Sequence, residues 1–550
     1  MSPKSVAIGL DGAAWHLLDP MLQSGTMPRL AALKEKGAWG TLKSTVPTYT
    51  PPAWTSAATG VNPGRHGIYG FVAGNAQSDR QELVHSGMIR ASTIWEIANE
   101  QGARAGIYNL PLTYPPRALD GWMVSGMMTP GYGEHLRGFA SWDGGGGGTD
   151  HGKTGANAQL EQRILEWAPG YVVDVSANYE QDWRDDALAK RALESIRQRE
   201  VVLRGLLELD PPDVLFAVME APDRLQHVYY RYLDPSDGLY SSDEGERLRD
   251  AVTECFAAMD RIVGLLEDYA GPDGGVVVCS DHGFTAWEVS VHVNALLEQW
   301  GYLELKGGGK AMQSGLARRM IPVAKRFLPR KLARRAKGRT FAAIDWGKTR
   351  AFASPIPQQG VFVNVAGRER FGIVPPDELE RLKDEIARRF EELRSPGGGR
   401  VTDRVHRAEE VFQGDATEGA PDLLPVLRDH RYELDDELFH KEPFTDLRHL
   451  PRGVHHPDGI VVVAGAGARP GRVGGTVMDV APTLLYQAGL KVPEGLDGGV
   501  LGDAFAPEML SRRPVATTAP LSSSEKDESS PYSQEEEALI EESLRGLGYL

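Results

Sequence analysis

The sequence lacks the features that mark disulfide-rich, zinc-thiolate or membrane-spanning proteins. Its 550 residues include two cysteines, Cys255 and Cys279, whose spacing fits neither a thiolate metal site nor a disulfide framework. No stretch approaches the ~18 consecutive apolar residues of a transmembrane helix. Only Met1 to Ser5 precede the first apolar run, Val6 to Leu10, which is too short for the core of a signal peptide. These absences predict a soluble cytoplasmic protein without a transmembrane segment.

Basic charge is also scarce. The formal net charge of −16 argues against nucleic acid, or an anionic membrane, as the main binding partner. A local exception is the basic segment 307–339. It is typical of a solvated helical face, and it also fits a contact with an anionic substrate or a peripheral membrane contact. The sequence does not indicate an oligomeric state.

Apolar runs of strand length alternate with stretches of helical spacing. The expected strands are 6–10, 104–108, 213–219, 275–280 and 459–465, and the expected helices include 28–36, 92–101, 183–208, 244–269, 377–393 and 478–489. Continuous apolar strands are typical of a mostly parallel sheet that is covered by helices on both faces. The sequence therefore predicts a doubly wound α/β core.

Three of these strands are followed directly by carboxylate or imidazole side chains. Asp11 follows the first strand, Asp223 and His227 come shortly after the strand 213–219, and Asp281 and His282 follow the strand 275–280. In open α/β sheets, ligands bind at the carboxyl ends of the strands. A single aspartate there is usually a turn residue, but three such positions, two with histidine, predict a shared site.

The stretch Ser44 to Phe71 predicts a strand end, a tight turn and a short helix. Thr50 stands at the turn, and Pro51 and Pro52 suit the first helical positions, so Thr50 is expected to be the N-cap. The turn would lift its hydroxyl clear of the sheet. Thr50 is therefore either an ordinary capping residue or a reactive group.

The collected groups suit divalent metal ions. Asp223 and His227 are four residues apart and share one helical face, as pairs of metal ligands do. Mixed carboxylate and imidazole ligands favour Zn²⁺ or Mn²⁺ over Ca²⁺ or Mg²⁺. With His455 from the motif GVHHPDGI, the ligand-type residues suffice for two ions, one of which could activate the Thr50 hydroxyl.

The motifs, in order, resemble a known family. They are LDG, PTYTPPAWTSAATGVNPGRHGI, PDRLQH, SDHG and GVHHPDGI, followed by VMDVAPTLLYQAGLKVPEGLDG. Over roughly residues 4 to 505, the sequence resembles the alkaline phosphatase superfamily, nearest its type I phosphodiesterase and nucleotide pyrophosphatase branch. The resemblance implies an alkaline phosphatase-like sandwich, with a mostly parallel central sheet flanked by helices and with inserted cap elements.

Residue by residue, the resemblance implies that Thr50 is the nucleophile and forms a covalent phospho-enzyme. It implies one metal held by Asp11, Thr50, Asp281 and His282, and a second held by Asp223, His227 and His455, usually zinc in this family. His456 remains open as an alternative to His455. His66, in GRHGI, is expected to pack or to support the site.

The implied activity is hydrolysis of a small-molecule phosphate ester by a phosphodiesterase or nucleotide pyrophosphatase. The sequence shows no identifiable arginine of the kind that grips a monoester, which favours a diester. Around Thr50 it also lacks the sulfatase pattern C/S-x-P-x-R. The alternatives are a phosphomonoesterase, a phosphomutase or phosphotransferase of the same superfamily, and a non-catalytic binding protein on this scaffold.

The composition divides the chain into three parts. Residues 1–507 are expected to form the catalytic domain, with cap insertions at about 127–182 and 300–345. Residues 508–532 include a Ser-, Thr- and Pro-rich stretch typical of a flexible linker. Residues 533–550 are expected to contain a helix, whose apolar face could dock on the body or on a partner.

Overall fold

The computed structural model describes residues 4–75, 77, 82–131, 136–144, 156–179, 181–307, 341–353, 360–465, 467–520 and 529–549. Apart from residue 307, the basic segment 307–339 lies outside the described residues, so its role stays a prediction. Within the described part of the chain, no helix is both long and apolar enough to cross a membrane.

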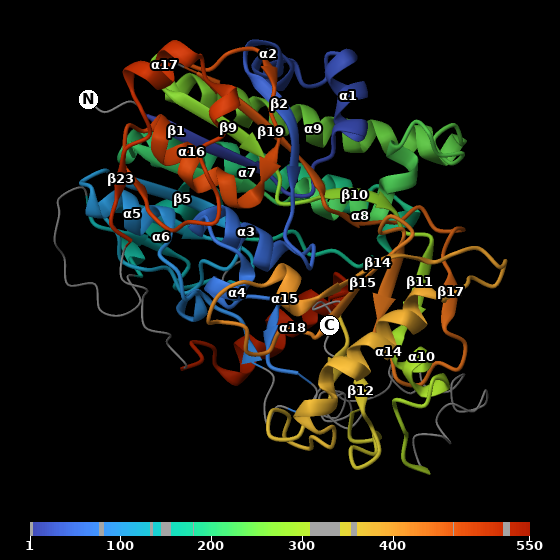
Figure 1. The fold of residues 1–550 in the computed structure, drawn as a ribbon. Coiled ribbons are helices and arrows are strands. Elements are labelled where there is room, and N and C mark those ends of the chain that lie inside the picture. Colours follow the sequence, from blue (N-terminus) through green and yellow to red (C-terminus); the bar gives the residue numbers. More distant parts are fainter. Residues whose placement is uncertain are drawn as a thin grey trace.

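A large twisted sheet forms the centre of the molecule (Figure 1). Its strands in spatial order are β20 (Gly471–Arg472), β2 (Ala38–Lys43), β19 (Asp458–Gly465), β9 (Gly275–Cys279), β1 (Ser5–Leu10), β8 (Val214–Met219), β5 (Ala105–Leu110), β6 (Gly121–Ser125) and β7 (Ala140–Trp142), and β21 (Gly475–Thr476) also pairs with β2. The five strands from β9 to β6 run parallel, whereas β19 is antiparallel to both of its neighbours. The sheet is therefore mostly parallel, as expected.

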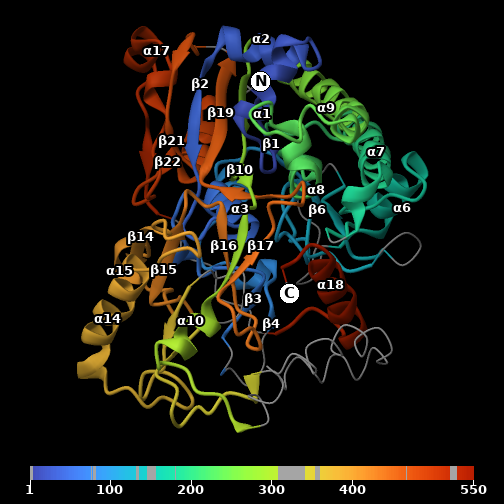
Figure 2. The same ribbon diagram turned by 90° about the vertical axis from the view of Figure 1, so that its right-hand side faces the viewer.

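Helices cover both faces of this sheet, which explains the continuous apolar strands. Alternate residues of β8 belong to different hydrophobic clusters: Leu215 and Ala217 to one, Phe216 and Val218 to the other. The first cluster includes residues of α1 (Trp15–Gln23), α2 (Pro28–Lys36), α6 (Ala158–Trp167), α7 (Ala187–Leu209), α8 (Ala221–Leu233) and α9 (Asp243–Ala270). The second includes residues of α3 (Thr50–Thr59), α5 (Ile94–Glu100) and α16 (Val480–Gln487). Figure 2 shows α7 and α9 together on one side of the sheet.

The strand directions bring distant parts of the chain to one edge of the sheet. The carboxyl ends of β1, β8 and β9 lie there because these strands are parallel. Since β19 is antiparallel to β9, its beginning lies at the same edge, and so does the end of β2. This topology positions the candidate site.

Between β9 and β19 the chain forms a separate lobe with its own hydrophobic cluster, in the lower part of Figure 1. The antiparallel pair β10 (Gly283–Ala286) and β18 (Gly453–His456) leads into and out of it. The lobe contains β11 (Val289–His292), α10 (Val293–Gln299), β12 (Ala351–Phe352), β13 (Phe362–Val363), α14 (Leu379–Glu391), β14 (Thr402–Arg407), α15 (Ala408–Val411), β15 (Leu423–Leu427), β16 (Tyr432–Asp435) and β17 (Phe444–Asp446). The lobe is larger than the expected insertion 300–345. Its strands are short and show little periodicity, so the sequence does not reveal its full extent.

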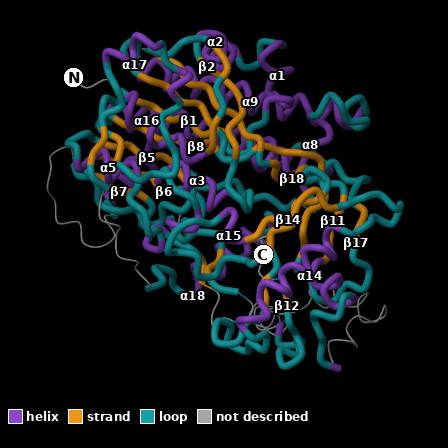
Figure 3. The backbone as a smooth tube through the Cα atoms, in the orientation of Figure 1, coloured by secondary structure: helices purple, strands orange, loops and turns teal. Residues whose placement is uncertain are grey.

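Two other expected segments contain more regular structure than their sequences indicate. The stretch 127–182 supplies α6 and β7, and β7 adds an edge strand to the central sheet (Figure 3). Within 508–532, α17 (Pro507–Arg512) and the pairing of β23 (Thr517–Thr518) with β22 (Val492–Pro493) are regular. The elements β7, α17 and β23 are too short to give a periodic signal, whereas α6 spans ten residues with Leu160 and Ile164 on its buried face. Helix α18 (Gln534–Gly546) follows near the end of the chain.

Gly9 sets the distance between β1 and α3. A Cβ atom at Gly9 would lie 2.5 Å from Cη2 of Trp54, whose side chain is buried on α3. We expect Gly9→Ala to destabilise the protein by about 1–3 kcal/mol, because the Trp54 ring has no room to move. Urea unfolding measures this change. Gly471→Ala on β20, where a Cβ meets nothing within 4 Å, is the matched control, and equal stability of the two variants would contradict this account.

Candidate metal centre

Thr50 begins helix α3 and is fully buried. The expectation that it caps the helix is wrong: Tyr49 holds the N-cap position, and Thr50 is the first helical residue. The hydroxyls of Thr55 and Thr59 on this helix each donate to a carbonyl four residues earlier, at 2.7 Å. Thr50 has no preceding helical turn, and its buried hydroxyl has no hydrogen-bond partner. The local fold therefore leaves this oxygen free for another role.

The residues around Thr50 link α3 to both groups of candidate ligands. The carbonyl of Thr48 accepts a hydrogen bond from Nδ1 of His455 at 3.0 Å. Four residues beyond Thr50, the Trp54 indole donates to Oδ2 of Asp11 at 3.0 Å. The start of α3 is thus held between Asp11 and His455.

Asp11, Asp281 and His282 form the first group of candidate ligands. All three are buried at the ends of β1 and β9, and their ligand atoms lie within 4.8 Å of one another. Nε2 of His282 lies 3.3 Å from Oδ2 of Asp281 and 3.7 Å from Oδ1 of Asp11. None of these three buried atoms has a hydrogen-bond partner. Unpaired buried polar atoms are costly, and a cation held by these three atoms would offset that cost.

Asp223, His227 and His455 form the second group, also within 4.8 Å. Asp223 and His227 project from the same face of α8, and His455 comes from β18. Oδ1 of Asp223 lies 3.1 Å from Nε2 of His455 and 3.4 Å from Nε2 of His227. The two imidazole Nε2 atoms are 2.9 Å apart.

Backbone carbonyls orient all three histidines in the same way. Nδ1 of His227 faces the carbonyl of Gly453 at 3.2 Å, Nδ1 of His455 that of Thr48, and Nδ1 of His282 that of Gly283 at 3.1 Å. Because a carbonyl can only accept, each Nδ1 carries the proton, and in a neutral ring Nε2 presents a lone pair. The lone pairs of His227 and His455 face each other and Asp223. A cation between them, either a proton or a metal ion, would satisfy these lone pairs.

The pKa values of the three buried carboxylates also favour a positive charge at the site. Burial and the negative charge of Asp281 raise the pKa of Asp11 well above its usual value. Burial also raises the pKa of Asp281 to about 7. Burial acts to raise the pKa of Asp223 as well, but His227 and Arg224 hold it well below the usual range. The residues therefore fit divalent ions, which would balance the buried negative charge.

The structure separates the two histidines that the sequence left open. His455 is buried in the second group, whereas Nε2 of His456 faces Oδ1 of Asp429 at 3.2 Å. His66 lies in neither group. Its Nδ1 accepts from the Ile68 amide, so its Nε2 donates to the Ser56 hydroxyl at 2.9 Å and ties the loop to α3. Burial lowers the pKa of His66 to about 3, which keeps the ring neutral.

Three residues that the sequence did not single out complete the surroundings. The buried Arg224 pairs with Asp223 and with Asp174, the latter at 2.9 Å. The ring of Tyr179 stacks on His227, with centroids 4.5 Å apart. The hydroxyl of Tyr549 lies 3.1 Å from Nε2 of His227 and 3.2 Å from Nε2 of His455. In the sequence, Tyr549 could have been noticed because it directly follows Gly548, a glycine just after an amphipathic helix.

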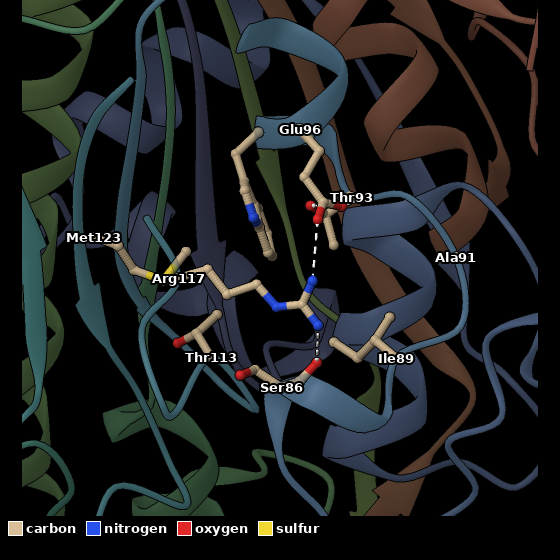
Figure 4. Close-up of a pocket in the computed structure, with 9 residues that line it drawn as sticks. Ser86, Ile89, Ala91, Thr93, Glu96, Thr113, Arg117 and Met123 are labelled. Carbon is tan, nitrogen blue, oxygen red and sulfur yellow. Dashed lines mark hydrogen bonds and ion pairs between the residues drawn. The ribbon is translucent and has the colours of Figure 1, made fainter. Parts of the chain in front are cut away.

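A small pocket beside α5 is not part of this site (Figure 4). Arg117 crosses it, donating to Glu96 at 3.2 Å and to the carbonyl of Ser86 at 3.0 Å. Glu96 also accepts from the Thr93 amide that begins α5. The charges in the pocket are thus paired with each other, and its residues serve the packing of α5.

The fold and the site define a class of protein. An α/β sheet with two carboxylate–imidazole groups and a free hydroxyl at one edge is the arrangement of a metal-dependent hydrolase. The chain belongs to the type I phosphodiesterase / nucleotide pyrophosphatase family, whose model matches residues 5–441, about four fifths of the chain. The protein is therefore a metal-dependent hydrolase of phosphate esters, and the fold class predicted from the sequence is confirmed. The match ends before His455.

Solved structures that the chain matches include phosphonoacetate hydrolase from Sinorhizobium meliloti 1021 in complex with phosphonoacetate. It is 18% identical, over 88% of this chain and 95% of that chain, with a TM-score of 0.49. Murine ectonucleotide pyrophosphatase / phosphodiesterase 5 is 12% identical, over 92% of this chain and 100% of that chain, with a TM-score of 0.45. No curated protein matches the chain.

The raised pKa of Asp281 predicts how pH affects the metal-free protein. The folded protein keeps the Asp281 proton up to about pH 7, whereas the unfolded chain releases it near 3.8. Rising pH across this window therefore lowers the free energy of unfolding. With a chelator present, we expect Asp281→Asn to melt several degrees higher than the wild type at pH 8, with a smaller difference at pH 4.5. Adding Zn²⁺ at pH 8 should raise the melting temperature of the wild type more than that of the variant. An Asp281→Asn protein that gains as much would contradict the assignment of Asp281 to the metal centre.

Proposed function

We propose that this protein is a phosphodiesterase or nucleotide pyrophosphatase that works through a covalent phospho-threonine at Thr50 and two divalent metal ions, with zinc expected and manganese as the alternative. The observation that carries the proposal is the buried, unpartnered hydroxyl of Thr50. The residues around it contact both groups, through the Thr48 carbonyl at His455 and the Trp54 indole at Asp11. In the first group, Asp11 Oδ1, Asp281 Oδ2 and His282 Nε2 also lack hydrogen-bond partners. The proposed ligands are Asp11, Thr50, Asp281 and His282 for one ion, and Asp223, His227 and His455 for the other.

The reaction has two steps. In the first, Thr50 Oγ attacks phosphorus, the bond to the leaving alcohol breaks, and the hydroxyl proton is lost to solvent. In the second, a water molecule attacks phosphorus, the bond to Thr50 Oγ breaks, and the threonine regains a proton. The metal ions, when bound, supply positive charge that favours the threonine alkoxide and stabilises the leaving oxygen.

This chain's own residues hold the reacting groups in place. Trp54 and Tyr49 fix the start of α3, so the Thr50 oxygen needs little reorganisation before attack. The three backbone carbonyls at Thr48, Gly283 and Gly453 hold the histidine Nδ1 atoms and leave the Nε2 atoms available to bind the proposed ions.

The surroundings of the site support a diester rather than a monoester. A monoester carries one more negative charge, which enzymes commonly balance with arginine. Arg224, the arginine that contacts the described ligands, is already paired with Asp174 and Asp223. The proposed substrate is therefore a small phosphodiester or pyrophosphate. The cytoplasmic location expected from the sequence stays a prediction.

Replacing the nucleophile tests the mechanism. We expect Thr50→Ala to lower kcat for bis-p-nitrophenyl phosphate by roughly a thousandfold or more, because the variant lacks the proposed attacking oxygen. Thr50→Ser should recover part of the activity. The matched control is Thr59→Ala on the same helix, whose buried hydroxyl bonds to Thr55 and not to the site. Wild-type turnover by Thr50→Ala would end the phospho-threonine proposal.

Metal content and substrate preference test the rest. The purified protein should bind about two zinc or manganese ions per chain and hydrolyse bis-p-nitrophenyl phosphate with a higher kcat/KM than p-nitrophenyl phosphate. Chelation should remove both activities. A preference for the monoester would instead favour a phosphatase or a mutase. Analysis of products with a competing alcohol would then distinguish transfer from hydrolysis.

A further inference from the structure

The segment 529–549, which we call the α18 segment, packs against the catalytic domain. At its start, the buried Tyr532 donates a hydrogen bond to the carbonyl of Met128 at 3.1 Å and stacks on Tyr114, with centroids 5.5 Å apart. Ser533 then caps α18 with the help of Glu536. Figure 2 shows α18 beneath α8, with the end of the chain turning inward from it.

One face of α18 is buried against the domain. Ile540, Leu544 and Leu547 are buried, whereas Leu539 on the same helix is 38% exposed. The carbonyl of Gly546 accepts a hydrogen bond from the amide of Tyr179 at 3.1 Å. Because Tyr179 also stacks on His227, the segment is attached directly to the surroundings of the metal centre.

The end of α18 aims one side chain into the centre. Gly548 has φ +76°, a left-handed conformation, and the Tyr549 amide donates back to the carbonyl of Leu544 at 2.8 Å. The Gly548 amide likewise donates to Arg545 at 3.1 Å, which completes a Schellman ending. This reversal of the chain directs Tyr549 inward. Its ring packs on Phe71 with centroids 4.6 Å apart, and only 4% of the residue is exposed.

The Tyr549 hydroxyl occupies space that a substrate would need. It lies within hydrogen-bond distance of Nε2 of both His227 and His455, the atoms that face the proposed metal position. Thr50 is 0% exposed in this conformation, so a phosphate group cannot reach its hydroxyl without a rearrangement. The phenol oxygen therefore lies where an oxygen of the phosphate group would approach.

We propose that the α18 segment competes internally with the substrate, with Tyr549 standing in for a phosphate oxygen beside His227 and His455. The site opens when the segment leaves, and docking of the segment and binding of the phosphate group exclude each other. This inference rests on the proposed function, because it takes the same site as the phosphate site.

The α18 segment can dock on the catalytic domain reversibly, because two contributions to its free energy of docking oppose each other. Five side chains of the segment are buried apolar or aromatic anchors: Tyr532, Ile540, Leu544, Leu547 and Tyr549. Their burial is opposed by the conformational entropy lost in ordering all of the residues 529–549. A ligand that binds only the open form can shift such a balance.

Hydrogen exchange of the Zn²⁺-loaded full-length protein, followed by mass spectrometry, tests the competition directly. Saturating inorganic phosphate should speed exchange in peptides that contain the amides of Gly548 and Tyr549, because their hydrogen bonds break when the segment leaves. Unchanged exchange would overturn the proposal. Slower exchange would also overturn it, since the segment would then close over the ligand.

A pair of variants on one helix provides the second test. Leu544→Glu places a charge on the buried face of α18 and should tighten phosphate binding roughly tenfold in calorimetry, by removing the competitor. Leu539→Glu, at the partly exposed edge of the same helix, is the matched control and should change phosphate binding much less than Leu544→Glu does. Tyr549→Phe keeps the ring but loses the hydroxyl, and it should tighten phosphate binding less than Leu544→Glu does.

The outcomes separate this inference from the proposed function. If phosphate binds the wild type and Leu544→Glu equally well, the competition is wrong and the phosphohydrolase stands. If neither protein binds phosphate, both ideas fail. If Leu544→Glu unfolds, as its melting temperature would show, hydrogen exchange of the wild type still decides the question.

Discussion

The arrangement of this protein depends on one electrostatic constraint: three aspartates and three histidines are buried together with too few partners of opposite charge. Asp11, Asp223 and Asp281 are at most 1% exposed. Like charges at such close range in a dry interior are costly, and the raised pKa of Asp11 and Asp281 expresses that cost. The sheet can hold the groups together because its strands are fixed on both faces by packed helices. A bound cation turns this repulsion into attraction.

The second requirement is that the histidines face the right way before any ion arrives. Backbone carbonyls hold the three histidine rings in this orientation. A side-chain substitution elsewhere leaves these carbonyls in place. Trp54 extends the same control to Thr50, since it packs against Gly9 and bonds to Asp11. Sheet, helix and site are therefore connected through a few direct contacts, and small changes in the packing under α3 reach the Thr50 hydroxyl.

The sequence predicted those features that depend on local pattern. The central strands and long helices were found because apolar runs and helical spacing are strong signals, and Asp11 and Asp281 were found because they follow such strands. The lobe between β10 and β18 was underestimated because its strands are short. Thr50 was expected to cap α3 because proline favours the first helical position, which placed the expected helix start at Pro51. The helix begins one residue before that, at Thr50 itself. The contact of Tyr549 with His227 spans 322 residues, and no local pattern can predict which surface a terminal helix covers.

The pairing of β10 with β18 also has a consequence for how the protein is made. His455 meets Asp223, 232 residues earlier in the chain, only after the intervening lobe has been synthesised and has brought β18 back to β10. A growing chain that emerges from its amino end already carries Asp11, Asp223, His227, Asp281 and His282, but it has only two members of the second group. On the ribosome, the first group can be completed well before the second. The two groups of ligand-type residues can therefore assemble at different moments of synthesis, the group that contains His455 last.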